Sequence, residues 1–302
     1  MCTECGCGLP GERPAGISSE SYHHDHGHPH EHGHPHDHHD HHHDHDHEHH
    51  HHDGHSHSHA HGGRHAHSHE HGPAQAHGRT IELHRAILDR NNRLAERNRG
   101  FFRARGLLVL NLLSSPGSGK TTLISETIRR LAPQLKTGVI VGDLATDNDA
   151  RRLRETGASV VQITTGTVCH LEAEMVARAL SQMDLTGLDL LIIENVGNLV
   201  CPASYDLGED LRVVLLSVTE GEDKPLKYPP MFQSAGACVL TKTDLAQACE
   251  FRRETALANL HRLSPAARVF ELSAKTGHGM DAWCAFIAER HASVRQRDLL
   301  SS

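Results

Sequence analysis

The sequence predicts an α/β fold, in which a mostly parallel sheet carries helices on both faces and is preceded by a disordered histidine-rich tail. From residue 107 onward, short apolar runs alternate with amphipathic stretches of helical period, which is typical of parallel sheets. Residues 23–77 hold 28 of the 33 histidines and lack Leu, Ile, Val, Phe and Trp, so burial cannot offset the entropy lost on ordering. We expect three parts: a cysteine-bearing segment at 1–22, the histidine tract at 23–77, and a globular domain at 78–302 that begins with a helix.

The charge of the chain is concentrated in the histidine tract. The 302 residues carry 38 acidic and 30 basic side chains, a net charge of -8, and the tract alone accounts for this excess. The remaining domain is neutral, which argues against a nucleic-acid-binding protein. No apolar run approaches the roughly 18 residues of a membrane span, and the first residues lack the features of a secretory signal. We therefore expect no membrane partner, a cytoplasmic location, and free cysteine thiols rather than disulfides.

The expected elements follow the apolar pattern along the chain. From residue 80, apolar pairs such as Ile87 with Leu88 and Phe101 with Phe102 recur near every seventh position, which predicts an amphipathic helix. Strands are predicted at residues 107–112, 138–141, 159–163, 188–193, 211–218, 237–240 and 267–272. Helices are predicted at residues 121–131, 171–183, 246–260 and 280–291. In open parallel sheets, the loops that follow the strands form the ligand crevice.

A glycine-rich loop with a lysine follows the first predicted strand. Residues 114–122 read SSPGSGKTT and lead into an amphipathic helix, which is the context that a P-loop requires. Backbone N–H groups of such a loop cradle phosphates, while the lysine reaches the β and γ oxygens and the threonine hydroxyl binds magnesium. Ser114 stands where the usual motif has its leading glycine, and an ordinary Gly/Ser connection is the alternative. The expected nucleotide-binding residues are Gly117, Ser118, Gly119, Lys120, Thr121 and Thr122.

Two later segments predict the choice of base. The segment that follows the strand ending at Leu240 places Asp244 where a carboxylate can accept both guanine donors, N1–H and the 2-amino group, a pair that adenine lacks. It resembles the Asn-Lys-x-Asp motif of GTPases, with Thr241 in place of Asn. A Ser-Ala-Lys segment after the next strand resembles the loop that closes over the base. The expected base-binding residues are Lys242, Asp244, Ser273, Ala274 and Lys275.

Two acidic loops lie between the phosphate and base motifs. Asp143 follows the second predicted strand and is expected to contact magnesium or water. Glu194 and Gly197 follow the fourth predicted strand, where a γ-phosphate sensor would lie. For Asp147 and Asp149, helix capping or solvation is the alternative. We expect Lys120, Thr121, Asp143 and Glu194 to be catalytic.

The first residues form a compact cysteine cluster. Cys2, Cys5 and Cys7 make a C-x-x-C-x-C motif, and three thiolates with one backbone or terminal nitrogen offer soft donors that suit nickel or copper. A redox pair is the alternative, but such a pair normally precedes a helix in a thioredoxin-like unit.

A second cluster lies inside the predicted domain. Cys169 and His170 open a predicted helix and Cys201 follows the Glu194 loop; these three ligands need water or a second subunit to complete a tetrahedral shell. Burial as small core residues is the alternative for the two cysteines. The remaining cysteines are expected in the core: Cys238, Cys249 and Cys284.

The histidine tract predicts metal storage. Neutral imidazoles bind zinc, nickel or copper, and at two to four per ion the tract would hold roughly seven to fourteen ions. An expression tag and drifted low complexity are the alternatives, and the interleaved Asp, Glu, Gly, Pro and Ser argue against a tag.

Five longer stretches carry a resemblance to a known family. They are residues 88–98, 114–122, 169–171, 194–207 and 217–229. Together with the N-terminal cysteine motif they resemble the HypB family, the nickel-inserting GTPases of hydrogenase maturation, and the similarity covers nearly all of residues 80–290. The resemblance implies a P-loop NTPase fold of the SIMIBI type.

The resemblance also implies a function, partners and metal sites. These are GTP hydrolysis coupled to nickel delivery into the NiFe-hydrogenase large subunit, the HypA metallochaperone as partner, and a homodimer promoted by nucleotide or metal. Two ligand sets are implied, a nickel or zinc site of Cys169, His170 and Cys201 and a tighter nickel site of Cys2, Cys5 and Cys7. The implied cofactors are GTP, Mg²⁺, Ni²⁺ and Zn²⁺, and the histidine tract looks like a nickel store.

Three departures from the family pattern bear on rate and nucleotide affinity. Thr167 and Val168 stand where Lys and Gly are usual, Thr241 replaces the guanine-motif Asn, and residues 142–146 lack the usual glutamines. No residue corresponds to a water-positioning glutamine, which predicts slow turnover.

The expected mechanism is in-line attack of water on the γ-phosphate. Lys120 and magnesium on Thr121 stabilise charge, while Asp143 and Glu194 hold the outer shell of the metal. Because the Cys201 loop directly follows the Glu194 loop, nucleotide state is expected to move a metal ligand. Two rival functions are a non-enzymatic nickel or zinc buffer and a related GTPase that serves urease or a zinc enzyme; the N-terminal motif and residues 194–207 argue against the latter.

Overall fold

Seven strands form one parallel sheet in the computed structural model, which describes residues 73–299. The strands are β1 (Leu108–Leu113), β2 (Thr137–Asp143), β3 (Ser159–Thr164), β4 (Leu190–Glu194), β5 (Leu211–Ser217), β6 (Ala237–Thr241) and β7 (Arg268–Glu271). Their order is β3-β2-β4-β1-β5-β6-β7, and every neighbouring pair is parallel. Every residue of β1, β4 and β6 is buried, because helices cover both faces of the sheet.

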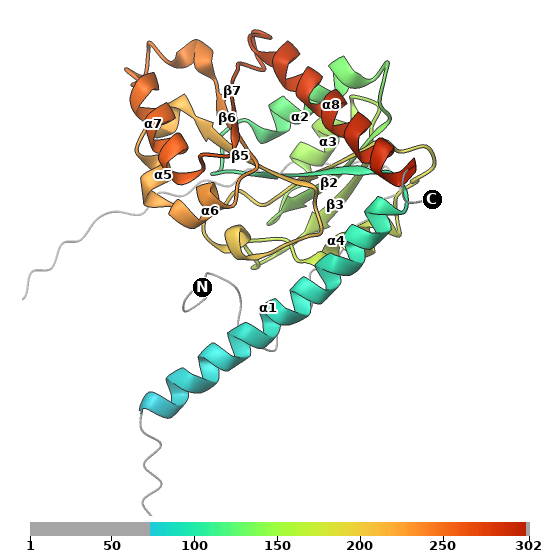
Figure 1. Ribbon diagram of the computed structural model, residues 1–302, viewed down its shortest axis with the longest axis vertical. Helices are drawn as coiled ribbons and strands as arrows, with labels where there is room; N and C mark the ends of the chain where they lie inside the picture. The colour runs from blue at the N-terminus through green and yellow to red at the C-terminus, as the bar shows by residue number, and fades with distance from the viewer. Residues whose placement is uncertain (1–72, 300–302) are drawn as a thin grey trace, which may run out of the picture. The chain divides into compact units, whose positions relative to one another are not determined.

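The helices divide between the two faces of the sheet. They are α1 (Pro73–Arg103), α2 (Lys120–Leu131), α3 (Asn148–Arg154), α4 (Ala173–Leu180), α5 (Lys224–Lys227), α6 (Pro229–Gln233), α7 (Arg253–Leu263) and α8 (Met280–Leu299), with 3₁₀ turns η1 (Cys201–Ser204), η2 (Val218–Glu220) and η3 (Thr243–Leu245). Helices α2, α3 and α8 pack on one face, while α1 and α4 pack on the other (Figure 1). This arrangement confirms the predicted α/β class and the P-loop NTPase fold.

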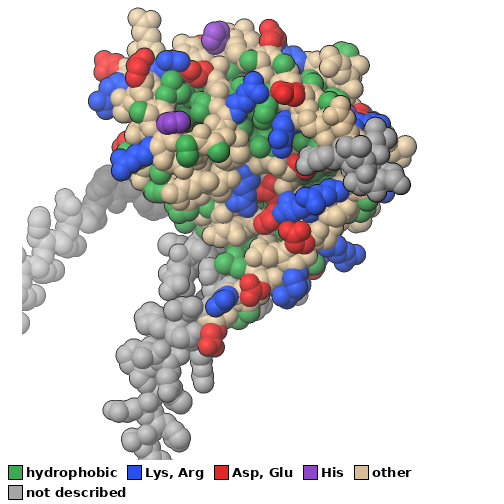
Figure 2. Space-filling model, in the orientation of Figure 1, with side chains coloured by type: hydrophobic (Ala, Val, Ile, Leu, Met, Phe, Trp, Pro, Cys, Tyr) green, Lys and Arg blue, Asp and Glu red, His purple; other side chains and the backbone are tan. Residues whose placement is uncertain are grey.

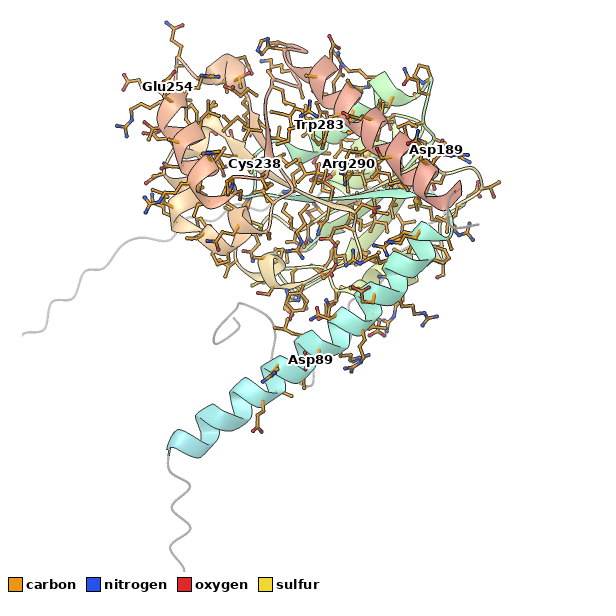
Figure 3. All side chains as sticks on the ribbon, viewed as in Figure 1. Asp89, Asp189, Cys238, Glu254, Trp283 and Arg290 are labelled. Carbon is orange, nitrogen blue, oxygen red and sulfur yellow. The ribbon has the colours of Figure 1, made fainter. Side chains whose placement is uncertain are left out.

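The alternation of β1 shows how one strand serves both layers. Leu108 and Leu110 belong to the core beneath α2 and α8, whereas Val109 belongs to the core beneath α1 and α4. Successive strand side chains point to opposite faces, so a run of apolar residues builds two cores at once. On α8, Trp283 packs over the sheet (Figure 3) and donates from Nε1 to Thr127 Oγ1 at 2.9 Å.

Several boundaries differ from those that the sequence pattern predicts. Helix α1 begins at Pro73, and α7 begins at Arg253 rather than at residue 246, because residues 243–251 form a 3₁₀ turn and further turns that include Glu250 at φ 51°. Cys249 lies in these turns and is exposed, so its assignment to the core is wrong; Cys238 and Cys284 are buried as expected. The short helices α3, α5 and α6 were not predicted.

Two further predictions concern surfaces and the tail. On the face shown in Figure 2, acidic and basic side chains are intermixed, with both signs along α1. Within residues 73–299, no helix has the length and apolarity needed to cross a membrane. The predicted N-terminal site of Cys2, Cys5 and Cys7 and nearly all of the histidine tract lie outside the described residues.

Candidate functional site

A cavity of about 510 Å³ opens at the carboxyl ends of the central strands. The loop from the end of β1 to the start of α2 forms one wall, and Gly119 caps α2 in the left-handed region at φ 94°, a conformation that glycine adopts without strain. The cavity is lined by Pro116, Gly117, Gly119, Lys120, Thr121, Thr122, Gly142, Asp143, Leu144, Asp149, Arg152, Glu194, Asn195, Val196, Gly197 and Lys242. The structure therefore brings together five of the six predicted phosphate residues, both acidic loops and one base-motif residue, whereas Ser118 is buried and does not line the cavity.

Lys120 is held by the serine that replaces the usual leading glycine. Its Nζ donates to Ser114 Oγ at 2.9 Å, and both side chains are buried. Burial lowers the pKa of Lys120, while nearby carboxylates, chiefly Glu194, oppose this shift. The departure at Ser114 thus provides a hydroxyl acceptor for the lysine of the predicted phosphate loop.

Thr121 and Glu194 form a buried pair across the cavity. Thr121 Oγ1 donates to Glu194 Oε1 at 2.8 Å, whereas Glu194 Oε2 is buried and has no hydrogen-bond partner. Burial raises the pKa of Glu194 to about 7, against the opposing influence of Lys120 and the Thr121 hydrogen bond. A hydroxyl and a carboxylate with a free oxygen fit a hydrated magnesium ion, which is bound through one or two carboxylates and water.

Asp143 ends β2 and lines the same cavity. Its Oδ1 accepts from the backbone N–H groups of Ala145 and Thr146, each at 2.9 Å, which fixes the carboxylate at the mouth of the loop. Asp149 of α3 also lines the cavity, whereas Asp147 is exposed and pairs with Arg151 at 2.9 Å. The solvated alternative therefore fits Asp147, whose side chain makes no capping hydrogen bond, while Asp149 is half-exposed in the first turn of α3 and lies 3.7 Å from Arg152.

Arg152 is a cavity residue that the sequence pattern did not indicate. It lies on α3, and its Nη2 donates to Thr122 Oγ1 at 3.4 Å. The signal was weak because α3 has only seven residues, which is too short for a clear helical period.

Gly197 lies against the phosphate loop. A Cβ at this position would stand 3.0 Å from the Cα and N of Pro116. A larger residue would therefore push on the loop that holds Lys120. This close approach places the Glu194–Gly197 segment in direct contact with the phosphate loop.

The first base motif is joined to the phosphate loop. Thr241 Oγ1 donates to the backbone O of Ser118 at 2.7 Å, and Lys242 Nζ donates to the backbone O of Gly117 at 2.7 Å. Threonine in place of asparagine therefore still provides a hydrogen bond that connects this motif to the phosphate loop.

The two base motifs lie side by side, and apart from Lys242 their predicted residues lie outside the cavity lining. The backbone N–H of Thr243 donates to the O of Leu272 at 3.3 Å, and the N–H of Ser273 donates to the O of His278 at 3.0 Å. Asp244 is exposed, and Ala274 and Lys275 follow the buried Ser273 at the same edge of the sheet. None of Asp244, Ser273, Ala274 and Lys275 lines the 510 Å³ cavity.

The internal cysteines and histidine converge as predicted. The ligand atoms of Cys169, His170 and Cys201 lie within 4.8 Å of one another, and the two sulfur atoms are 2.9 Å apart. His170 is 1 % exposed, and its ring packs on that of Tyr205 with centroids 3.8 Å apart. Two thiols and an imidazole at this separation form a donor set that suits nickel or zinc.

Glu172 lies beside this cluster. Its Oε1 is 3.7 Å from His170 Nε2, and the interaction with His170 holds the pKa of Glu172 below its ordinary value. A carboxylate next to a ligating imidazole orients the ring and raises its basicity.

Asn195 joins the metal cluster to the nucleotide cavity. Its Oδ1 accepts from the backbone N–H of Leu171 at 3.3 Å and from that of Val196 at 2.9 Å, and its Nδ2 donates to Asn111 Oδ1 at 3.3 Å. Leu171 directly follows His170, and Asn195 directly follows Glu194. One buried carboxamide therefore contacts both segments, a role that the sequence pattern did not indicate.

Comparison with known proteins gives consistent relatives. Residues 108–271 match the family model described as CobW/HypB/UreG, nucleotide-binding domain. The hydrogenase maturation factor HypB of Escherichia coli (strain K12) is 52 % identical over 211 residues, which are 70 % of this chain and 73 % of that protein.

Two solved structures match the fold over the same part of the chain. HypB from Archaeoglobus fulgidus is 40 % identical with a TM-score of 0.64, covering 67 % of this chain and 99 % of that chain. HypB from Helicobacter pylori, solved in complex with nickel, is 42 % identical with a TM-score of 0.64, covering 68 % of this chain and 96 % of that chain.

Proposed function

The chain belongs to the CobW/HypB/UreG family as a HypB hydrogenase maturation factor, and from this membership we propose that it is a magnesium-dependent GTPase that delivers nickel to the NiFe-hydrogenase large subunit. The observation that carries the proposal is the Asn195 bridge, which connects the Thr121–Glu194 pair of the nucleotide cavity to the Cys169–His170 segment. This bridge supports a functional link between the proposed nucleotide site and the proposed metal site.

In the proposed hydrolysis step, water attacks the γ-phosphate in line with the leaving oxygen. Lys120 stabilises the charge on the β and γ oxygens. Bound magnesium would neutralise phosphate charge, held by the Thr121 hydroxyl with Asp143 and Glu194 orienting its water ligands. Asp244 would select guanine. Because the described residues that line the cavity include no glutamine to orient the attacking water, slow turnover is expected.

Nickel is the proposed cargo of the internal cluster. Cys169, His170 and Cys201 supply three donors, and a fourth position is left for water or for a donor from a second copy of the chain in the proposed dimer. Zinc, which accepts the same donors, is the alternative occupant. An open coordination position suits an ion that must be released.

Coupling is proposed to run through the loop that contains Glu194 and Asn195. A change in γ-phosphate occupancy shifts Glu194, and Asn195 passes this shift to the backbone at Leu171 beside His170. The nucleotide then sets the affinity for nickel. Nickel would be supplied from the N-terminal cysteines and the histidine tract, and HypA is the proposed partner in the transfer.

The deciding experiment replaces Lys120 with alanine in a hydrogenase-producing strain and measures hydrogenase activity across a range of added nickel. The expected result is a loss of activity at limiting nickel, because charge on the phosphates is no longer stabilised. Lys136→Ala is the matched control, since Lys136 is half-exposed and bonds to Thr186 O and Asp184. Normal activity with Lys120→Ala would refute delivery driven by GTP hydrolysis.

Storage is separated from delivery by a deletion. Removing residues 23–72 takes away the histidines that precede α1. Loss of nickel tolerance with intact hydrogenase activity assigns storage to the tract and delivery to the rest of the chain. Loss of tolerance together with normal activity in the Lys120→Ala strain would favour a non-enzymatic metal buffer.

A further inference from the structure

Two buried asparagines on α1 bridge the same two segments of the domain. Asn91 Oδ1 accepts from the N–H of Ala173 at 2.9 Å, and its Nδ2 donates to the O of Asp206 at 2.8 Å. Asn98 Nδ2 donates to the O of Ala173 at 2.9 Å and to the O of Leu207 at 3.1 Å. Both side chains are 4 % exposed. Because they are seven positions apart, about two helical turns, they project from one face of the helix.

The bridged segments carry all three ligands of the internal metal cluster. Ala173 begins α4, three positions after His170. Asp206 and Leu207 follow η1, which begins at Cys201. Each carboxamide therefore connects the Cys169–His170 side of the cluster to the Cys201 side through α1. This link is additional to the direct approach of the two sulfur atoms and to the ring contact of His170 with Tyr205.

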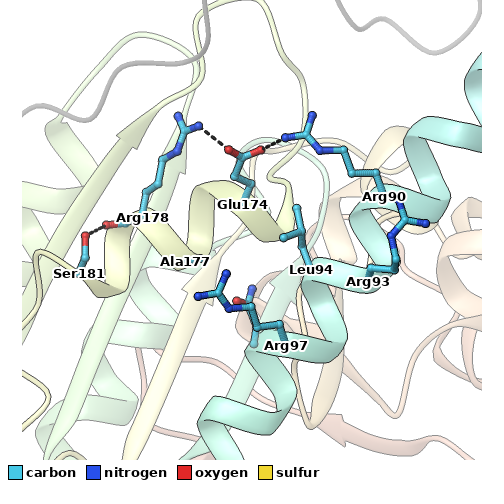
Figure 4. Close-up of a pocket in the computed structure, with 9 residues that line it drawn as sticks. Arg90, Arg93, Leu94, Arg97, Glu174, Ala177, Arg178 and Ser181 are labelled. Atoms are coloured by element: carbon cyan, nitrogen blue, oxygen red, sulfur yellow. Dashed lines mark hydrogen bonds and ion pairs between the residues drawn. The ribbon is translucent and has the colours of Figure 1, made fainter.

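The asparagines differ from the exposed ion pairs that also attach α1 to α4. Beside them, Arg90 pairs with Glu174 at 2.7 Å and Glu174 with Arg178 at 2.5 Å along a groove of about 450 Å³ between α1 and α4 (Figure 4). These pairs are exposed, and exposed ion pairs contribute little to stability. A buried carboxamide is different, because its loss leaves backbone groups without partners in a dry environment.

Close packing keeps the Cys201 side near α1. Gly208 adopts φ 92°, and a Cβ there would stand 2.6 Å from the backbone O of Ala95. Arg99 adds a hydrogen bond from Nη1 to the O of Glu209 at 2.8 Å. The loop that follows η1 thus packs closely against the backbone of α1. The hydrogen bonds of Asn91 and Asn98 to Asp206 O and Leu207 O hold this loop at a fixed position along the helix.

We propose that Asn91 and Asn98 are positioning residues of the internal metal site, which fix the distance between its Cys169–His170 and Cys201 sides. The inference rests on the proposed metal-binding role of this cluster. Mutating residues that orient metal ligands without touching the ion typically lowers metal affinity by about 10- to 100-fold. We expect a loss of nickel affinity in this range when the side chain of Asn91 or Asn98 is replaced.

The test uses the full chain and reads one cysteine at a time. Alkylation of Cys169 is followed by peptide mass spectrometry at nickel concentrations fixed by a chelator buffer, so that metal taken up elsewhere in the chain does not alter the free concentration. Asn98→Ala removes both of its hydrogen bonds. Asn91→Asp keeps an acceptor for Ala173 N–H and places a carboxylate oxygen, instead of a donor, against Asp206 O. Exposed Cys249 is the internal control for reagent activity.

The expected result is that protection of Cys169 requires at least about tenfold more free nickel in both variants, with GTP-analogue affinity and thermal unfolding close to wild type. Arg90→Ala, which removes an exposed ion pair of the same helix interface, is expected to behave like wild type. If Asn98→Ala does not fold, Asn91→Asp decides the question.

A spectroscopic measurement separates positioning from general loosening. In a full chain that carries Cys2→Ser, Cys5→Ser and Cys7→Ser, the thiolate-to-nickel absorption band at saturating metal is expected to shift in the asparagine variants. Unchanged protection in the variants, an unshifted band, or an equal loss of nucleotide affinity would each overturn the inference. Absence of nickel protection at Cys169 in the wild type would instead overturn the proposed metal site.

Discussion

Thr121 and Glu194 come from different elements and meet in one buried hydrogen bond. Thr121 lies in the first turn of α2 and Glu194 ends β4, yet Thr121 Oγ1 stands 2.8 Å from Glu194 Oε1. The Thr121 hydroxyl donates its proton to the carboxylate, so its oxygen keeps lone pairs that can bind the proposed magnesium ion. The hydrogen bond therefore holds both groups in place for that ion rather than excluding it.

Glu194 is expected to make nucleotide binding depend on pH. Its pKa is raised from the ordinary 4.5 to about 7 by burial. Since the folded value is the higher one, its contribution to the stability of the nucleotide-free protein is fully present below pH 4.5 and is lost as pH rises through about 7. Binding of magnesium and GTP needs the charged carboxylate, so it is expected to strengthen over the same rise.

Thermal unfolding without nucleotide and magnesium–GTP affinity, each measured against pH, check this expectation. Glu194→Gln is expected to flatten both profiles. Asp147→Asn is the control, because Asp147 is exposed and pairs with Arg151. A wild-type profile that does not change near neutral pH would contradict the proposed role of Glu194.

Gly197→Ala is expected to impair GTP hydrolysis more than it impairs folding. The new Cβ would stand 3.0 Å from Pro116 and displace the phosphate loop, and a displacement of this kind costs about tenfold or more in rate. Steady-state GTP hydrolysis is the measurement. Gly100→Ala is the control, because a Cβ on Gly100 meets nothing within 4 Å. Equal rates for the two variants would show that the Gly197 contact does not support the active geometry.

Asp244→Ala is expected to abolish the preference for guanine. A carboxylate that accepts the 2-amino group of guanine discriminates against inosine, which lacks that group, by about tenfold or more. The measurement is the ratio of GTP to ITP affinity, which should approach one in the variant. Glu250→Ala, an exposed acidic residue nearby, is expected to leave the ratio unchanged. A wild type that binds GTP and ITP equally would remove Asp244 from the base site.

Asn195→Ala is expected to uncouple nickel affinity from the nucleotide. The substitution removes the hydrogen bonds to Leu171 N–H and to Asn111. Nickel affinity is measured in the GDP state and in the GTP-analogue state, and the ratio of the two should fall toward one in the variant. Asn259→Ala is the control, because it removes a hydrogen bond to Glu222 O that involves neither the cavity lining nor the metal cluster. Equal nickel affinities in the two nucleotide states of the wild type would contradict the proposed coupling. An unchanged ratio in Asn195→Ala would exclude coupling through Asn195.

The sheet was predictable because its central strands are apolar on both faces. Runs such as Leu190–Glu194 are recognisable without any knowledge of their neighbours, and the phosphate loop follows a strand with residue types dictated by its chemistry. The short helices α3, α5 and α6 span four to seven residues, and such lengths give no periodic signal. Their positions depend on packing that forms only in the folded chain.

The polar residues that organise the site were hidden for a different reason. Asn91 and Asn98 lie among charged residues of an amphipathic helix, where a polar side chain is normally solvated, and their partners are 75 to 115 positions away. Asn195 likewise stands in a loop where nothing in the local sequence indicates burial. By contrast, the sequence did indicate the cluster of Cys169, His170 and Cys201, because thiols and imidazoles are residue types that commonly bind soft metal ions.

The strand order has a consequence for how the protein is made. Strand β1, which leads into the phosphate loop, is hydrogen-bonded to β4 and β5 and to no earlier strand. During synthesis, the phosphate loop therefore leaves the ribosome well before the rest of the cavity lining. Strand β1 can pair only after the later strands β4 and β5 have been made. A bound nucleotide can stabilise the folded cavity only after Lys242, the last residue of its lining, has been made. Until β4 and β5 are made, the apolar β1 lacks the strands that flank it and is prone to aggregate.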